Sequence, residues 1–297
     1  MRTIAVLLLA LIVMTGCGHH ENDETPIIAV STGPQAWLAE ELLPDSTASV
    51  IQLLPPGADP ESYEPAVGTL KQLARSKVWL TMRTPGFEES LEPKIRANFP
   101  NLAITDVSIG IKRDLPHFCN HDHHDHGEHS NGNDAAETHE GSDPHLLSSI
   151  RNAGLMASNM SAEFQRLFPD KADAIKERET KLLSKLKNLD DSIAAALSDG
   201  HHSRAFLIEH PSIGYFARDY GLEQISLQEE GKESTPTQTA MALDHAQAEG
   251  AKVMFTEKEH PAATSAELAR QSGIDIVEIS LYSRDYLEAL RKITGAL

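Results

Sequence analysis

The 297-residue sequence is poor in cysteine and lacks the short signatures of several enzyme classes. It has two cysteines, Cys17 and Cys119, and no CxxC pair, so a framework of several disulfides is excluded. It also contains no HExxH, no Gly-rich phosphate loop and no GxSxG elbow, which mark metalloproteases, nucleotide-binding enzymes and α/β-hydrolases. An enzyme of these classes is therefore not predicted.

Positive charge is also scarce, and no run of lysine or arginine occurs. The 26 basic side chains face 44 acidic ones, which gives a formal net charge of −18. A nucleic-acid-binding surface needs clustered positive charge, so DNA and RNA are not expected partners. Cations suit such a chain better, although an acidic surface also serves solubility. The length and a hydrophobic content of 40% allow two domains, each of about 100 to 150 residues.

The N-terminal apolar run from Ile4 to Met14 is too short to cross about 30 Å of hydrocarbon. It is typical of an export signal, and the following letters MTGC resemble a bacterial lipobox with methionine in the usual leucine place. We expect residues 1–16 to be a lipoprotein signal peptide, Cys17 to be lipidated, and residues 17–26 to form a tether to the cell envelope, periplasmic or on the outer face of the cytoplasmic membrane. The alternative is a plain secretory signal with an incidental cysteine.

Apolar runs of strand length alternate with helical spacing in two parts of the chain. Such alternation predicts parallel sheets flanked by helices, with binding sites at the carboxyl ends of the strands. Between these parts, a helical pattern from Pro169 to Leu197 makes a rod about 40 Å long. The predicted fold class is α/β, with two parallel-sheet lobes joined by one long rigid helix. The expected limits are 27–165 for the first lobe, 166–199 for the linking helix and 200–297 for the second lobe.

Eight of the fifteen histidines lie between residues 117 and 145. Residues 114–141 show no apolar periodicity, which predicts a His-rich surface loop. An unordered segment loses conformational entropy when it wraps an ion, so its metal binding should be weaker than that of a built site. The alternative is a neutral low-complexity insertion. The candidate accessory ligands of this loop are His117, His121, His123, His124, His126, His129 and His139.

Three less conspicuous residues stand at predicted strand ends or helix starts. Glu61 lies in the loop GADPESYEP, which follows a predicted strand ending near Leu54. His145 opens a predicted helix in the motif SDPH, where Asp143 can support its imidazole, and His210 directly follows the strand AFLIE. Taken singly, each residue has an ordinary explanation as a solvated glutamate or as an exposed or packed histidine.

Four longer patterns contain or follow these residues: GADPESYEP, DPHLLSSIRNA, HPSIGYFARDYGL, and AEGAKVMFTE followed by LARQSGIDIVEI. In order and separation they resemble the cluster A-I solute-binding proteins of ABC transporters that import zinc or manganese. The resemblance covers nearly everything after Pro26 and extends to the lipobox, the long helix and the His-rich insertion. It implies two α/β lobes with a metal ion buried between them. It also implies a monomer without enzymatic activity, which delivers the ion to the membrane permease of an ABC importer.

The resemblance assigns metal-ligand roles to His145 and His210, which match two histidines of the family. The first-lobe ligand of the family is usually histidine in the pattern GADPHxYEP, and here Glu61 takes its place. A fourth ligand, where present, is an acid shortly after the strand equivalent to DIVEI. The expected protein ligands are thus two imidazoles and one carboxylate. Water is the first choice for the open position, and the alternatives are Glu257, His260 and Ser280, the last a poor ligand.

This donor set favours zinc. Two histidines and a glutamate with one open position form a well-attested zinc site, whereas manganese prefers more oxygen. The His-rich loop also favours Zn²⁺ over Mn²⁺, because within the family such loops resemble a feature of the zinc importers. A three-ligand zinc site also resembles a hydrolase centre, but the sequence shows no positioned general base. A metal-dependent adhesin is a third alternative, and its partner-binding surface would tolerate loss of the three ligands.

Overall fold

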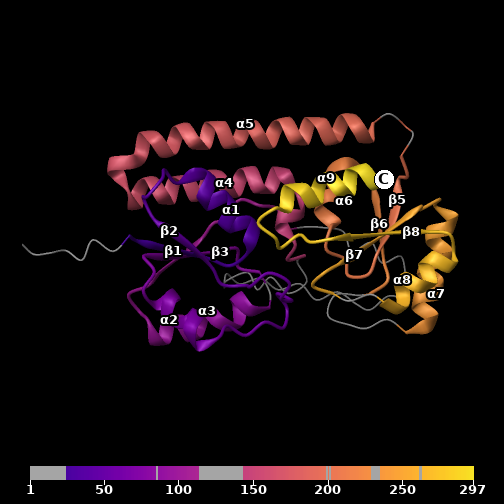
Figure 1. Cartoon of the computed structure of the whole chain (residues 1–297), viewed down its shortest axis with the longest axis horizontal. Helices are drawn as coiled ribbons and strands as arrows, with labels where there is room; N and C mark the ends of the chain where they lie inside the picture. Colours follow the sequence, from indigo (N-terminus) through magenta and orange to yellow (C-terminus); the bar gives the residue numbers. More distant parts are fainter. Residues whose placement is uncertain are drawn as a thin grey trace, which may run out of the picture.

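The computed structural model describes residues 25–84, 86–113, 143–198, 200, 202–228, 235–260 and 263–297. The expected signal peptide, Cys17, nearly all of the tether and the seven candidate histidines of the His-rich loop lie outside the described residues. Within the described part, two four-stranded sheets lie side by side and one long helix runs across both (Figure 1). No helix in this part of the chain is both long enough and apolar enough to cross a membrane.

The first lobe is a parallel sheet in the order β2-β1-β3-β4. Helices α1 and α4 cover one face of this sheet, and α2 and α3 cover the other (Figure 1). Short apolar strands such as β3, whose four residues are all buried, form because both faces of the sheet are covered. The elements are β1 (Ile27–Val30), α1 (Gly33–Leu42), β2 (Ser49–Gln52), α2 (Val67–Ala74), β3 (Val78–Thr81), α3 (Phe87–Asn98) and β4 (Ala103–Asp106).

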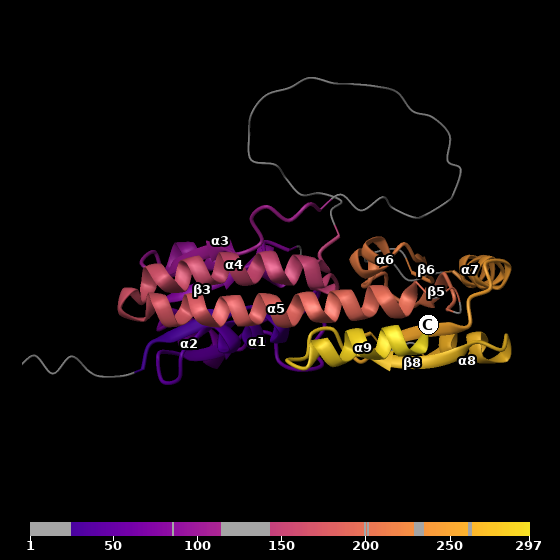
Figure 2. The ribbon, with the colours of Figure 1, turned by 90° about the horizontal axis from the view of Figure 1, so that it is seen from above.

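Two antiparallel helices follow, and the second of them spans the molecule. The short turn η1 (Leu146–Ser148) leads into α4 (Ile150–Leu167), and η2 (Pro169–Lys171) leads into α5 (Ala172–Leu197). The break between α4 and α5 falls at Pro169, which supplies no backbone N–H for a continuing helix. The 26 residues of α5 make a rod of about 39 Å. Figures 1 and 2 both show α5 running beside α4 and on to α9 of the second lobe.

The second lobe repeats the topology of the first, with strand order β6-β5-β7-β8. All of its strand pairs are parallel, as are those of the first lobe. The predicted α/β fold of two parallel-sheet lobes and one long helix is therefore confirmed. The elements are β5 (Ala205–Ile208), α6 (Gly214–Tyr220), β6 (Glu223–Ser226), α7 (Pro236–Ala248), β7 (Val253–Glu257), α8 (Ala263–Gln271), β8 (Asp275–Ile279) and α9 (Tyr286–Ala296).

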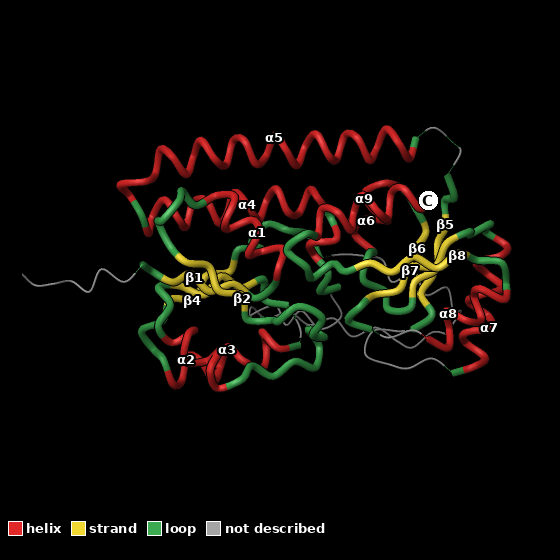
Figure 3. Tube along the Cα trace, in the orientation of Figure 1, coloured by secondary structure: helices red, strands yellow, loops and turns green. Residues whose placement is uncertain are grey.

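One hydrophobic core continues through both lobes. It includes Val30 of the first sheet, Met160 of α4, Leu186 of α5 and Ile293 of α9, all 2% exposed or less. Because α5 packs on α1, α4 and α9, it holds the lobes as one body. The strands of both sheets run toward the junction between the lobes (Figure 1), and loops gather there (Figure 3). Loops that follow the strands of different lobes therefore meet there.

Candidate metal centre

Glu61, His145 and His210 meet at the junction between the lobes. Each offers one ligand atom, and these three atoms lie within 4.8 Å of one another. His210 Nε2 lies 3.0 Å from His145 Nε2 and 3.3 Å from Glu61 Oε1. Tetrahedral donors at the usual zinc distances are themselves about 3.3 Å apart, so the spacing suits one zinc ion. The three residues singled out in the sequence thus come together in space.

His145 is held in place by contacts from both lobes. It caps the turn η1, and its backbone N–H donates to Asp143 Oδ1 over 2.7 Å. The same carboxylate oxygen lies 2.8 Å from His145 Nδ1, so Nδ1 carries the proton and Nε2 is left with a lone pair for an ion. The Tyr215 hydroxyl of α6 donates to the Asp143 carbonyl over 3.0 Å. The orientation of the imidazole therefore depends on a residue from the second lobe.

His210 follows β5 and is packed between two other imidazoles. Its ring stacks on His260 at a centroid distance of 4.3 Å and meets the edge of His145 at 4.8 Å. Burial, and then the neighbouring His145 and His260, lower the pKa of His210 to about 2. The ring is consequently neutral near pH 7, which is the form that binds a metal ion.

Glu61 is positioned by its own loop and by the backbone of a second loop. Asp59 Oδ1 accepts a hydrogen bond of 2.8 Å from the Glu61 backbone N–H, which fixes the turn. Gly86, with φ of 91°, packs directly on this turn, and a Cβ there would lie 2.6 Å from the Pro60 carbonyl oxygen. The Phe87 N–H donates to that same carbonyl over 3.2 Å. The approach of the two backbones depends on glycine at position 86.

The loop that contains Gly86 is tied down by a buried carboxylate. Glu88, which is 1% exposed, accepts hydrogen bonds from the backbone N–H groups of Met82 and Thr84. Burial raises the pKa of Glu88, and these hydrogen bonds oppose that effect. This support for Glu61 is not predictable from the sequence, because the stretch PGFEES has no metal-binding signature. The positive φ of Gly86, which packs against the backbone of Glu61, is visible only in the structure.

Gly86→Ala should weaken zinc binding by roughly tenfold or more, the range seen when a group that orients a ligand is lost. The new Cβ would meet the Pro60 carbonyl and would also require a left-handed backbone that alanine disfavours. Competition titration with a chelator measures the affinity. The matched control is Gly273→Ala, because Gly273 has a φ of 79° and a Cβ there would have no other atom within 4 Å. Equal affinity in both variants would contradict the role assigned to Gly86.

The residues considered for the open position occupy different environments. Glu257 ends β7, is 3% exposed, and neither of its carboxylate oxygens has a hydrogen bond. Burial raises its pKa to about 7, opposed by the nearby His145. His260 Nε2 lies 3.9 Å from Asp59 Oδ1. The Ser280 hydroxyl donates to Glu259 Oε1 over 2.7 Å, so it is engaged elsewhere.

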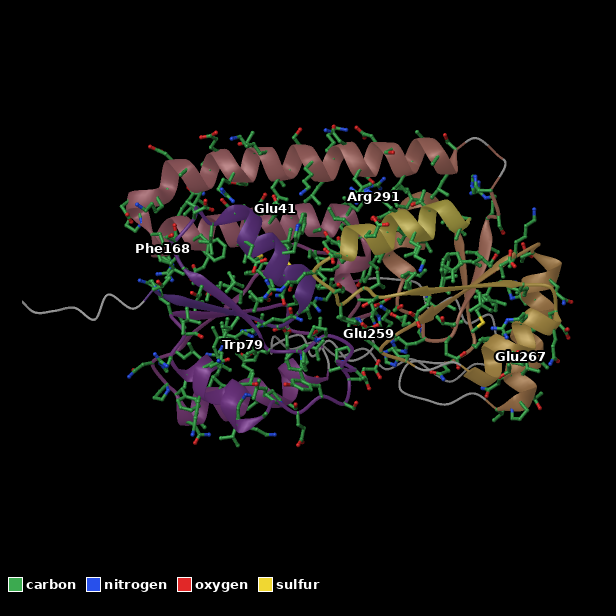
Figure 4. The ribbon with its side chains drawn as sticks, viewed as in Figure 1. Glu41, Trp79, Phe168, Glu259, Glu267 and Arg291 are labelled. Carbon is green, nitrogen blue, oxygen red and sulfur yellow. The ribbon has the colours of Figure 1, made fainter. Side chains whose placement is uncertain are left out.

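Glu259 is a buried acid that no sequence pattern singled out. It is 5% exposed, and Figure 4 places it at the junction between the lobes. The second acid in the stretch FTEKEH was the only signal for it in the sequence. Glu257 and Glu259 are two carboxylates of the second lobe close to the cluster of Glu61, His145 and His210. The positive charge of a cation would offset the repulsion between these negative charges.

One other group of potential ligands occurs among the described residues, on the outer surface of the second lobe. Glu223, His245 and Glu249 offer ligand atoms within 4.8 Å of one another, but His245 and Glu249 are exposed. The side chains of the His245–Glu223 pair are 43% and 37% exposed. Water competes at such a site, so it has less support than the buried cluster.

Comparison with known proteins places the chain among metal-uptake proteins. Residues 28–297 match the sequence model of ZnuA, described as zinc-uptake complex component A, periplasmic. The zinc-binding protein AdcA of Streptococcus pyogenes serotype M3 (strain ATCC BAA-595 / MGAS315) is 25% identical over 240 residues, which are 78% of this chain and 45% of AdcA. This chain thus spans about half the length of the curated relatives that it matches first.

Two solved structures agree over nearly the whole described fold. A crystal structure of ZnuA has a TM-score of 0.78 and 25% identity, and the match covers 92% of this chain and 99% of that one. A zinc-bound deletion mutant of ZnuA gives a TM-score of 0.77 and 25% identity, over 92% and 98% of the two chains. With the family match extending over residues 28–297, the chain belongs to the ZnuA family of periplasmic zinc-uptake components.

Proposed function

We propose that this protein captures Zn²⁺ outside the cytoplasm, in the cleft between its lobes, and delivers it to the membrane permease of an ABC importer. The observation that carries the proposal is the convergence of Glu61, His145 and His210 within 4.8 Å. The names of its relatives support it, because AdcA is called a zinc-binding protein and a ZnuA variant has been crystallised with zinc bound. In this proposal the metal ion is cargo, and the protein has no enzymatic activity.

Zinc is the preferred ion because of the donors that meet in the cleft. Two neutral imidazoles and one carboxylate are a common set of ligands for zinc, whereas manganese prefers a larger share of oxygen donors. Manganese binding is the second candidate, since Glu61 supplies oxygen where family members usually supply nitrogen. Metal analysis of protein purified without chelators, followed by competitive titration of Zn²⁺ and Mn²⁺, tests the assignment. A higher affinity for manganese would overturn it.

Capture and release require only small movements of the lobes. An ion pair joins Arg284 to Glu40 across the junction, and a Cβ at Gly33 would lie 2.8 Å from the backbone nitrogen of Arg284. The lobes already touch at this point, and α5 packs against helices of both. We therefore expect a slight tilt and local loop movement on binding, in place of a wide hinge opening. Docking on the permease then has to weaken the bonds between the ion and its ligands.

Attachment to the membrane places the protein next to the permease. Lipidation of Cys17, as the MTGC sequence predicts, would anchor a monomer through the tether 17–26. A single zinc ion bound between two lobes of one chain needs no second copy. Mass spectrometry of the mature N-terminus tests the lipid, and light scattering tests the monomer. An unmodified N-terminus other than Cys17 would show a plain secretory signal.

The His-rich segment 114–141 collects or senses zinc with lower affinity and raises its concentration near the cleft, and the cleft supplies selectivity. Deleting residues 117–139 should remove the weaker zinc-binding events and leave the tightest site unchanged, because Glu61, His145 and His210 lie outside the deletion. Calorimetric titration of the full-length and deleted proteins measures stoichiometry and affinity. Below about pH 6 the weaker events should also fade, as ordinary imidazoles become protonated. Loss of the tightest site on deletion would refute the accessory role.

A further inference from the structure

Glu257 and His210 both come from the carboxyl ends of strands in the second sheet. Strands β5 and β7 are parallel neighbours, and Ile208 pairs with Phe255. His210 follows Ile208 by two residues and Glu257 follows Phe255 by two, so both residues stand at the carboxyl ends of neighbouring strands. Neighbouring strands are about 4.8 Å apart. The acid therefore comes from the strand next to the one that carries a metal ligand.

Glu257 is unusual among the buried glutamates of the described residues. Its two oxygens are buried and neither accepts a hydrogen bond. The Ser212 hydroxyl lies near enough to Glu257 to lower its pKa and is a candidate donor, but the distance and angles leave the two groups without a formed hydrogen bond. Every other buried glutamate has at least one partner: Met82 for Glu88, Arg166 for Glu163, Lys176 for Glu179, Gln228 for Glu209 and Ser280 for Glu259.

A buried carboxylate without a partner is costly, because its lost hydration is not replaced. A divalent cation replaces that hydration directly, and Glu257 stands at the edge of a group that can hold one. The carboxylates of Glu61 and Glu259 are close enough to influence Glu257, as is the imidazole of His145. Glu259 already accepts the Ser280 hydroxyl, which occupies the place where the resemblance expects an acid. This leaves Glu257 as the second-lobe carboxylate with both oxygens available.

We propose that Glu257 is the fourth protein ligand of the captured ion, so that each lobe supplies a carboxylate in addition to the two imidazoles. As the side chains stand, Glu257 lies outside the group whose ligand atoms are all within 4.8 Å of one another. Its carboxylate therefore moves in on binding, by a change of side-chain rotamer. The inference rests on the proposed zinc-binding function and replaces water as the first choice for the open position.

A second carboxylate alters which ions the site accepts. Oxygen donors suit manganese better than nitrogen donors do, so two imidazoles with two carboxylates tolerate Mn²⁺ more readily than two imidazoles with one. Glu257 then determines specificity as well as affinity. Its removal should cost manganese binding more than zinc binding, because zinc keeps both of its imidazoles.

The test compares Glu257→Gln with Glu209→Gln by competitive titration of Zn²⁺ and Mn²⁺. Glutamine keeps the shape but loses the charge, and Glu209 is a buried acid next to His210 in sequence, whose side chain accepts a hydrogen bond from Gln228. We expect Glu257→Gln to weaken zinc binding about 10-fold to 100-fold and manganese binding more, with Glu209→Gln unchanged. A thermal melt of each variant without metal confirms folding.

A crystal structure with zinc gives the direct readout. An oxygen of Glu257 should lie at about 2.0 to 2.2 Å from the ion. A water at the fourth position, or equal affinities in Glu257→Gln and the unaltered protein, would overturn the inference. The proposed function would still stand in that case if His210→Ala abolished tight binding. Tight zinc binding that survives His210→Ala would reject the proposed function itself.

Discussion

We expect His210→Ala to lower the affinity for zinc by at least about a thousandfold, equal to roughly 4 kcal/mol. The lost imidazole is the one whose Nε2 lies close to both of the other proposed ligands, at 3.0 Å and 3.3 Å. It is also neutral at physiological pH, because burial and the two adjacent histidines lower its pKa to about 2. No proton has to leave this ring before an ion binds. The alanine variant therefore loses the full contribution of one nitrogen donor.

Competition with a chromophoric chelator, on protein lacking residues 117–139, measures this loss without interference from the other histidines. His245→Ala is the control, because His245 belongs to the exposed group on α7 and is remote from the cleft. We expect His245→Ala to keep the affinity of the tight site. The reverse outcome, with a loss in His245→Ala alone, would move the tight site to the outer surface of the second lobe.

We expect Glu61→Ala to lower the affinity for zinc by about a hundredfold, equal to roughly 3 kcal/mol. The carboxylate is the charged donor of the first lobe and lies 3.3 Å from His210 Nε2. Its side chain is 31% exposed, so water can enter the vacated position and recover part of the loss. The effect should therefore be smaller than that of His210→Ala, whose ring is buried.

Glu61→His separates a ligand role from a general charge effect. A third imidazole supplies a nitrogen donor at the place where the family usually has histidine, so zinc binding should persist and manganese binding should fall. Glu64→Ala, in the same loop but exposed, is the control and should leave both affinities unchanged. If Glu61→Ala and Glu64→Ala have the same small effect, Glu61 is not a ligand. Parallel titrations of Zn²⁺ and Mn²⁺ on all three variants decide between these outcomes.

The contacts around the site suggest why the protein keeps one rigid core. A site made of residues from both lobes holds its geometry only if the lobes hold theirs, and α5 provides this through packing against α1, α4 and α9. The Tyr215 hydroxyl of the second lobe supports Asp143 and hence His145. Small changes at the junction therefore reach the imidazole of His145, one of the proposed ligands. Such coupling is what the proposed release of the ion on docking would require.

Part of the candidate site is predictable from local patterns. His210 is one example, because a polar residue directly after an apolar strand lies at a carboxyl end of a parallel sheet. His145 is another, from the SDPH motif, and the structure shows its imidazole and its backbone N–H both contacting Asp143. The close contact between the backbones of Gly86 and Pro60 is not predictable, because a backbone contact between two loops leaves no pattern in the sequence of either loop. Glu257 is a candidate in the sequence, but its lack of hydrogen-bond partners depends on the side chains packed around it and is visible only in the structure.

The fold class and the set of possible ligands follow from the chain alone, because strand and helix periodicity and the residue types at strand ends are local properties. Which of these candidates meet is decided by tertiary packing. His145 and His210 are 65 residues apart in the sequence and belong to segments on either side of α5, yet their Nε2 atoms lie 3.0 Å apart. That distance is set by the packing of two sheets against one helix. Packing between distant segments depends on all of them at once and cannot be predicted from any one local pattern.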